Sequence, residues 1–123
     1  MTRKRVLIIG STGMLGRAVF NNLRATDLSV LETSRTSGLL FDAETDSAEA
    51  LLEAAGLRKG DFVVNCAGLT KSHIDDSKME TIERAVRLNI LFPIRLARAA
   101  DRIGIRVIQV ATDCVFSGNQ GAY

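Results

Sequence analysis

Three glycines near the start of the chain have the spacing of a turn that binds phosphate groups. Gly10, Gly13 and Gly16 follow the apolar run 6–9 and precede the pattern of an amphipathic helix. In such a turn the first glycine allows a tight bend, the second lets backbone N–H groups approach a pyrophosphate, and the third allows close helix packing. The start of the helix adds unpaired N–H groups and partial positive charge. The spacing predicts a dinucleotide-binding turn, with an ordinary glycine turn as the alternative, and we also assign to it Thr12, Met14 and Leu15.

The residues at the end of the second predicted strand bear on which dinucleotide would bind. A fold of this type that prefers NAD places an acidic residue there, about 20 residues past the glycines, to bind both ribose hydroxyls. Ser34 and Arg35 stand at that position. A guanidinium suits a 2′-phosphate, and a serine removes the repulsion that a carboxylate would cause. The sequence therefore predicts NADP(H) in preference to NAD(H). In one alternative the strand ends two residues earlier and Glu32 takes this position. In the other, Arg35 is a solvated surface residue without a ligand.

Small and hydroxyl side chains stand at the ends of two later predicted strands. Cys66 ends the run at 61–66, and Ala67 and Gly68 follow it. All three are small enough to let the backbone pass close to a cofactor. A tight turn between strand and helix would need the same residues. Thr112 comes just past the run at 106–111, at the edge where α/β folds bind ligands, and an ordinary strand-end hydroxyl is its alternative.

Alternating strands and helices must position these residues. Apolar runs predict strands over 6–9, 28–33, 39–41, 61–66 and 106–111, and periodic segments predict helices over 14–24, 47–55 and 78–102. Asp46 or Ser47 would cap the second helix. This alternation predicts an α/β fold with a doubly wound parallel sheet, the Rossmann fold, in strand order 3-2-1-4-5. The candidate ligand segments then share one edge of the sheet.

The composition is that of an ordinary globular domain. The 123 residues are 46% hydrophobic and 24% charged, and 16 basic and 14 acidic residues leave a net charge of +2, too balanced for a nucleic-acid surface. The apolar run after the basic residues 3–5 is too short for a signal peptide, and no run approaches the about 18 residues that span a bilayer. We therefore expect a cytoplasmic protein without nucleic-acid or membrane partners. Cys66 and Cys114 match neither a disulfide framework nor a metal site, and we expect no metal.

The long predicted helix is apolar on nearly all sides in the segment that begins at Leu88 and ends at Ala97. One face must cover the sheet, so we expect the other to be buried by further parts of the chain or by a second copy in a homodimer. The arginines of this helix favour a solvated stripe, partly paired with Glu80 and Glu83, over a ligand site.

Four segments carry a resemblance to a known family. They are the glycine turn at 10–16, Val-Val-Asn-Cys-Ala-Gly at 63–68, Arg-Leu-Asn at 87–89 and, most specific, Ala-Thr-Asp-Cys-Val-Phe-Ser-Gly at 111–118. With them the chain resembles the extended short-chain dehydrogenase/reductase superfamily, and within it the dTDP-4-dehydrorhamnose reductase-like sugar-nucleotide reductases. The similarity covers essentially the whole chain. It implies a nicotinamide dinucleotide and hydride transfer to a keto-sugar linked to a nucleotide.

The resemblance also implies roles for single residues. Thr112 matches the family's catalytic Ser/Thr, whose hydroxyl would hydrogen-bond the substrate oxygen where charge develops. Asp42 matches an Asp near the adenine amino group, with a helix cap as the alternative. Asn89 matches a helical Asn whose backbone carbonyl holds a water in the proton relay. Pro93 has no N–H to donate to that carbonyl, so we expect it to leave the carbonyl free for this water. The alternative is that Pro93 only kinks the helix.

The family's general acid is a Tyr followed four residues later by a Lys that lowers the pKa of the Tyr. The one tyrosine of this chain is its last residue, Tyr123, which corresponds to an earlier loop tyrosine of the family. We therefore expect residues 1–123 to be an NAD(P)-binding Rossmann domain that lacks the C-terminal, substrate-binding portion and is inactive alone. The alternatives are a sugar-nucleotide epimerase or dehydratase, and a non-catalytic NADP(H)-binding regulatory subunit.

Overall fold

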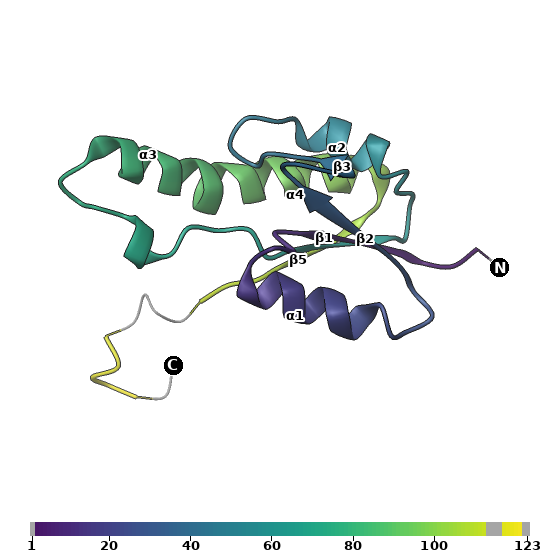
Figure 1. Ribbon diagram of the computed structural model, residues 1–123, viewed down its shortest axis with the longest axis horizontal. Coiled ribbons are helices and arrows are strands. Elements are labelled where there is room, and N and C mark those ends of the chain that lie inside the picture. Colours follow the sequence, from purple (N-terminus) through teal and green to yellow (C-terminus); the bar gives the residue numbers. More distant parts are fainter. Residues whose placement is uncertain (1, 113–116, 122–123) are drawn as a thin grey trace.

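Five parallel strands form the centre of the computed structural model, which describes residues 2–112 and 117–121 (Figure 1). The strands are β1 (Arg5–Ile9), β2 (Ser29–Ser34), β3 (Leu39–Leu40), β4 (Phe62–Asn65) and β5 (Arg106–Gln109). Their order across the sheet is β3-β2-β1-β4-β5, and every neighbouring pair is parallel. The predicted Rossmann-like topology is confirmed.

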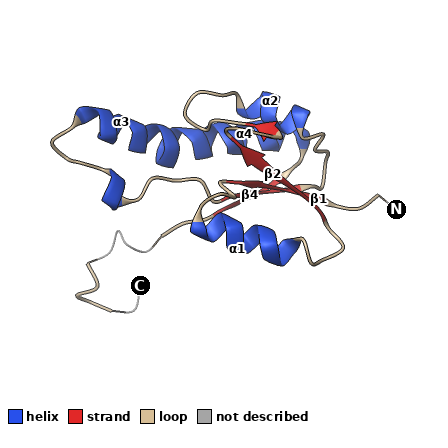
Figure 2. Cartoon of the chain, viewed as in Figure 1, coloured by secondary structure: helices blue, strands red, loops and turns tan. Residues whose placement is uncertain are grey.

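Helices lie on both faces of this sheet (Figure 2). α1 (Met14–Leu23) covers one face, whereas α2 (Ala48–Ala54), α3 (Met79–Val86) and α4 (Phe92–Ile103) lie on the other. Two short helical segments, η1 (Lys71–His73) and η2 (Arg87–Leu91), precede α3 and α4 respectively. The hydroxyl of Ser47 caps α2 by accepting a hydrogen bond from the N–H of Ala50 at 3.1 Å. Ser47 is one of the two caps that the sequence predicted.

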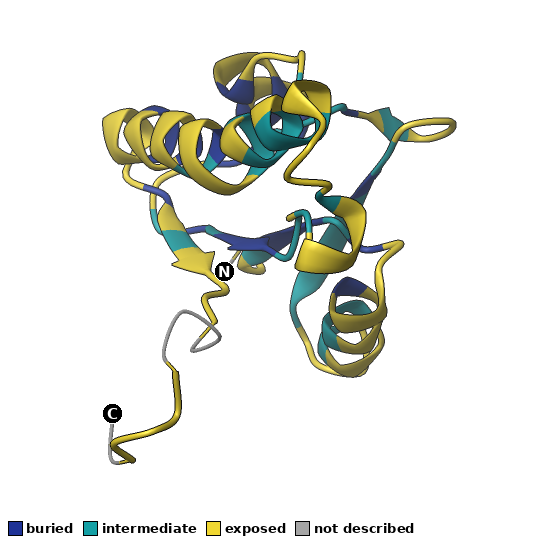
Figure 3. Ribbon diagram, turned by 90° about the vertical axis from the view of Figure 1, so that its left-hand side faces the viewer, coloured by how far each residue is buried: buried dark blue, intermediate teal, exposed yellow. Residues whose placement is uncertain are grey.

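β1 contributes to the packing on both faces of the sheet. Leu7 and Ile9 belong to the core beneath α2 and α4, while Val6 and Ile8 belong to the core beneath α1. Each of the four is at most 3% exposed. Figure 3 shows the buried positions gathered in the sheet and on the inner sides of the helices. A strand covered on both faces explains why the run at 6–9 has no polar alternation.

The predicted long helix is present, but a wider turn interrupts it. α3, η2 and α4 follow one another directly, and the N–H of Phe92 donates to the carbonyl of Arg87, five residues back. Pro93 is the second residue of α4 and has no N–H to donate, which accounts for an interruption at this point. Gly104, with a φ of 82°, ends the helix in the left-handed conformation.

Several large apolar side chains remain exposed to solvent. Leu15, in the first turn of α1, is 46% exposed. Ile90 and Ile94 of the long helix are 53% and 50% exposed. Their burial by further chain or by a second copy therefore stays a prediction. Within residues 2–112 and 117–121, no helix is long and apolar enough to cross a membrane.

Candidate functional site

A cavity of about 510 Å³ lies at the carboxyl edge of the sheet. The ends of β1, β2 and β4 meet there, together with the segment that follows β3 and one side of α3 and η2. This is the edge at which ligands bind in open parallel sheets. The lining residues are Ile9, Gly10, Thr12, Gly13, Thr33, Ser34, Arg35, Thr36, Phe41, Asp42, Ala43, Glu44, Cys66, Ala67, Gly68, Leu69, Arg84 and Leu88.

The glycine turn brings backbone atoms closer than side chains would allow. Gly10 has a φ of +79°, and a Cβ there would lie 2.7 Å from the nitrogen of Ala67. A Cβ on Gly16 would lie 2.0 Å from the carbonyl oxygen of Gly10. Gly13 is the N-cap of α1 and has no side chain to cap it, and its carbonyl accepts from the N–H of Arg17. The N–H groups of the first turn of α1 are therefore available to an anion at the cavity.

Most residues that the sequence assigned to a dinucleotide line this cavity. Those that do are Gly10, Thr12, Gly13, Ser34, Arg35, Asp42, Cys66, Ala67 and Gly68. Met14 and Leu15 are exposed on α1, and Gly16 is buried where α1 meets the turn. None of these three residues lines the cavity. They could contribute to dinucleotide binding only through their backbone N–H groups or by packing the turn. Among the described residues no cluster of His, Cys, Asp and Glu could hold a metal ion.

The end of β2 presents a cation to the cavity. Arg35 is exposed, and no ion pair joins it to the described parts of the chain. The hydroxyl of Ser34 accepts from the N–H of Thr36 at 3.1 Å, which bends the chain after the strand. Glu32, the alternative residue for this end of the strand, lies 3.6 Å from a guanidinium nitrogen of Arg17 on α1 and does not line the cavity.

Asp42 shapes the segment that follows β3. Its Oδ1 accepts from the N–H of Glu44 at 2.9 Å, and its own N–H donates to Asp46 Oδ2 at 2.7 Å. Ser47, not Asp42, caps α2, so the helix-cap alternative for Asp42 is wrong. Asp42 lines the cavity instead.

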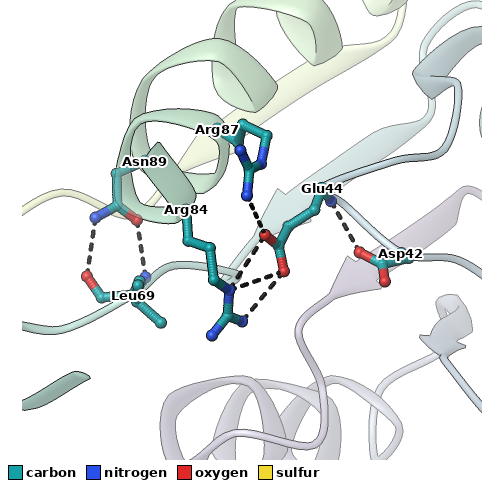
Figure 4. Close-up of polar contacts among 6 residues, drawn as sticks. All are labelled: Asp42, Glu44, Leu69, Arg84, Arg87 and Asn89. Atoms are coloured by element: carbon teal, nitrogen blue, oxygen red, sulfur yellow. Dashed lines mark hydrogen bonds and ion pairs between the residues drawn. The ribbon is translucent and has the colours of Figure 1, made fainter. Parts of the chain in front are cut away.

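Glu44, which the sequence did not single out, joins the segment after β3 to the long helix (Figure 4). Arg84 Nε donates to both carboxylate oxygens at 3.2 Å, and Arg84 Nη2 donates to Oε2 at 3.1 Å. Arg87 Nη2 donates to Oε1 at 3.3 Å. The hydrogen bond from Arg84, together with the charges of both arginines, holds the pKa of the Glu44 carboxyl below its usual range.

This contact corrects the prediction of a solvated arginine stripe. Three of the arginines pair with a carboxylate from another element, Arg84 and Arg87 with Glu44 and Arg102 with Glu49 of α2, and Arg84 lines the cavity. Arg87 also lies 3.9 Å from Glu83, one of the two acidic residues predicted to pair with the stripe. The prediction failed for Arg84 because helical spacing shows only neighbours on the same helix, whereas Glu44 is 40 residues away in sequence.

The side chain of Asn89 fastens the loop after β4 to the helix (Figure 4). Its Oδ1 accepts from the N–H of Leu69 and its Nδ2 donates to the carbonyl of Leu69, both at 2.8 Å. The sequence did not predict this contact. The relay role that it assigned to the Asn89 backbone carbonyl stays a prediction.

Asn65 shapes the other end of the same loop. It is fully buried, its Oδ1 accepts from the N–H of Ala67 at 3.1 Å, and its Nδ2 donates to Gln109 Oε1 at 2.8 Å. These bonds link the small residues after β4 to β5. Thr112 follows β5 and is exposed, and it does not line the cavity. Asp113, Cys114 and Tyr123 lie outside the described residues.

Cys66 is a thiol within the cavity lining. It is half-buried, and burial raises the pKa of the Cys66 thiol, which keeps it protonated and slow to react. If a dinucleotide fills the cavity, it should shield this sulfur. We expect NADPH at ten times its dissociation constant to slow alkylation of Cys66 by iodoacetamide about tenfold.

Mass spectrometry of the Cys66 peptide measures this protection and separates it from modification at Cys114. Sodium sulfate at matched ionic strength, added in place of NADPH, is the control and should leave the rate unchanged. Equal alkylation rates with and without saturating NADPH would show that the ligand does not occupy the Cys66 side of the cavity.

Comparisons with known proteins agree with this fold. The model of the RmlD substrate binding domain family matches residues 4–123. A dTDP-4-dehydrorhamnose reductase of Mycobacterium tuberculosis is 34% identical over 118 residues, which are 96% of this chain and 36% of that protein. Methionine adenosyltransferase 2 subunit beta of Xenopus tropicalis is 30% identical over 128 residues, which cover 98% of this chain and 36% of that protein. The chain thus spans about a third of the length of these relatives.

A solved structure shows the same fold. A dTDP-4-dehydrorhamnose reductase of Bacillus anthracis, crystallised in complex with NADP, superposes with a TM-score of 0.77 at 22% identity. The superposition covers 98% of this chain and 40% of that one.

Proposed function

The chain belongs to the RmlD substrate binding domain family, and we propose that it is the dinucleotide-binding part of an NADP(H)-dependent reductase that acts on a nucleotide-linked keto-sugar. The glycine turn is the observation that carries this proposal. Gly10 and Gly16 stand where a Cβ would strike backbone, and the start of α1 has no side-chain cap. These residues fit a pyrophosphate, which needs close backbone N–H groups and a positive helix end.

The rest of the cavity lining fits the two ends of the same cofactor. Ser34 and Arg35 would receive a 2′-phosphate, and Asp42 would lie by the adenine. Cys66, Ala67 and Gly68 are small enough to let a cofactor pass close to the backbone. The relative from Bacillus anthracis, which was crystallised with NADP, supports NADP(H) as the choice.

Arg35 provides the first test of this assignment. We expect Arg35→Ala to weaken NADPH binding about ten- to a hundredfold, because a charge-assisted contact to the 2′-phosphate is lost. NADH has no 2′-phosphate, so its affinity should change less than about twofold. Isothermal titration calorimetry of both dinucleotides measures the difference.

Arg95→Ala is the matched control, since Arg95 is exposed on α4 and does not line the cavity. It should bind both dinucleotides as the wild type does. If the wild-type chain binds NADH more tightly than NADPH, the assignment of NADP(H) is wrong.

The proposed chemistry is reduction of a carbonyl group, for which bound NADPH would supply the hydride. Thr112 would donate a hydrogen bond to the carbonyl oxygen as negative charge develops on it. The backbone carbonyl of Asn89 would hold a water of the proton relay, since Pro93 offers it no N–H. No Tyr is followed four residues later by a Lys in residues 1–123. We therefore propose that these residues alone bind NADP(H) without reducing a sugar nucleotide.

A non-catalytic binding module is the second candidate function. The similarity to methionine adenosyltransferase 2 subunit beta, at 30% identity, supports a chain that binds NADP(H) within an assembly. An epimerase or dehydratase would instead keep its nicotinamide tightly bound and regenerate it. The whole protein distinguishes the three: a reductase consumes NADPH with a keto-sugar nucleotide, an epimerase or dehydratase retains the cofactor through purification, and a binding module does neither.

The apolar outer side of the long helix supports a further contact. Ile90, Leu91 and Ile94 are between 37% and 53% exposed and lie close together along the helix, so their exposed apolar surface is grouped. We propose that it packs against further parts of a longer chain or against a second copy.

A further inference from the structure

Four charged side chains line the cavity, and the proposed function uses only two of them. They are Arg35, Asp42, Glu44 and Arg84. Asp42 accepts a hydrogen bond from the N–H of Glu44, and Arg84 is ion-paired with the carboxylate of Glu44. Arg35 has no ion-pair partner within the described ranges. Of the two cations that line the cavity, one is therefore compensated by a protein carboxylate and one is not.

The carboxylate of Glu44 forms ion pairs with two arginines. Its side chain is 17% exposed and lies against the guanidinium groups of both Arg84 and Arg87. Arg84 directs its Nε and Nη2 toward this carboxylate, so its charge is paired with that of Glu44 (Figure 4). Partial burial makes such a pair stronger than a fully exposed one. Glu44 thereby sets how much positive charge the cavity offers to an incoming anion.

We infer that Glu44 determines the cofactor specificity of the cleft by neutralising Arg84, the second cation of its lining, so that a 2′-phosphate is bound through Arg35 alone. This inference rests on the proposed function. Its consequence is that the two members of the Glu44–Arg84 pair affect the preference for NADPH over NADH in opposite directions. Loss of Glu44 leaves Arg84 uncompensated in the cavity that would hold the phosphate, whereas loss of Arg84 leaves a carboxylate there that repels it.

The test compares the ratio of the NADH and NADPH dissociation constants in the wild type and two variants. Glu44→Gln removes the charge but keeps the size of the side chain, and we expect this ratio to rise about three- to tenfold. Arg84→Gln should lower the ratio by a similar factor, about three- to tenfold. Both effects should shrink in 0.5 M salt, because the charges are partly exposed to solvent. Arg84 is 39% exposed, so Arg84→Gln tests the inference even if Glu44→Gln destabilises the chain.

Glu83→Gln is the matched control. Glu83 lies 3.9 Å from the same Arg87 and is 61% exposed, but it does not line the cavity. Its loss makes the same change of net charge, and the ratio should stay within about twofold of the wild-type value.

Three outcomes separate the inference from the function on which it rests. Opposite shifts of the ratio in Glu44→Gln and Arg84→Gln support it. An equal weakening of NADPH and NADH binding, with the ratio unchanged, would show that the pair only holds the structure together, and would overturn the inference while leaving the proposed function intact. Failure of the wild-type chain to bind either dinucleotide would overturn the proposed function and the inference with it.

Discussion

Replacing Gly16 by alanine is expected to prevent stable folding of the chain and to abolish dinucleotide binding. The new Cβ would lie 2.0 Å from the carbonyl oxygen of Gly10 and 2.8 Å from the Cα of Ser11, and backbone atoms have no rotamer by which to move away. α1 would have to shift off β1, which loosens the packing of Val19 and Leu23 against the core. We expect the free energy of unfolding to fall by about 3 kcal/mol or more.

Thermal unfolding followed by circular dichroism measures the loss, and Gly13→Ala is the matched control in the same turn. Gly13 has a φ of −74°, and its added Cβ would meet the Gly10 carbonyl oxygen at an ordinary 3.5 Å. This control should keep the fold, with a midpoint within about 4 °C of the wild type. Gly13 lines the cavity, so we expect Gly13→Ala to bind NADPH more weakly than the wild type although it folds normally. A Gly16→Ala chain that melts like the wild type would refute the packing role of Gly16.

Short-range patterns were enough to predict the fold and one wall of the cleft. The apolar run at 6–9 and the glycines after it are contiguous in sequence, and contiguous residues stay together in any fold. The strand order followed from the handedness of β-α-β units, and it brought Arg35 and Cys66 to one edge although they are far apart in sequence. Residues at strand ends were therefore predictable from topology alone.

Contacts between side chains of distant elements were not predictable in this way. Glu44 reaches Arg84 across 40 residues, and Asn89 reaches Leu69 across 20. Helical spacing shows which residues share a face, but not which segment of the chain packs on that face. The acidic residues at 42–46 are visible in the sequence, but nothing in their spacing points to the long helix. The opposite wall of the cleft depends on these unpredicted contacts.

Asp61 is a buried carboxylate that joins three segments at the opposite edge of the sheet. It is 6% exposed, its Oδ1 accepts from the N–H of Arg5 at 3.0 Å, and its Oδ2 accepts from the N–H of Arg58 at 2.8 Å. Its backbone carbonyl accepts from the N–H of Arg106. The residue thus orders the starts of β1, β4 and β5 together, although it stands far from the cleft.

Replacing Asp61 by alanine is therefore expected to lower the free energy of unfolding by about 2–4 kcal/mol, because two backbone N–H groups lose a charged acceptor and are left without a partner. Asp61→Asn keeps one acceptor oxygen but turns an N–H₂ toward a donor. Its free energy of unfolding should therefore lie between those of Asp61→Ala and the wild type. Asp27→Ala is the control, since Asp27 is exposed and its side chain makes no hydrogen bond or ion pair in the described part of the chain. Urea unfolding measures all three. An Asp61→Ala chain as stable as the Asp27→Ala chain would mean that water replaces the carboxylate without loss, and that the three strand starts are held by their backbone ladder alone.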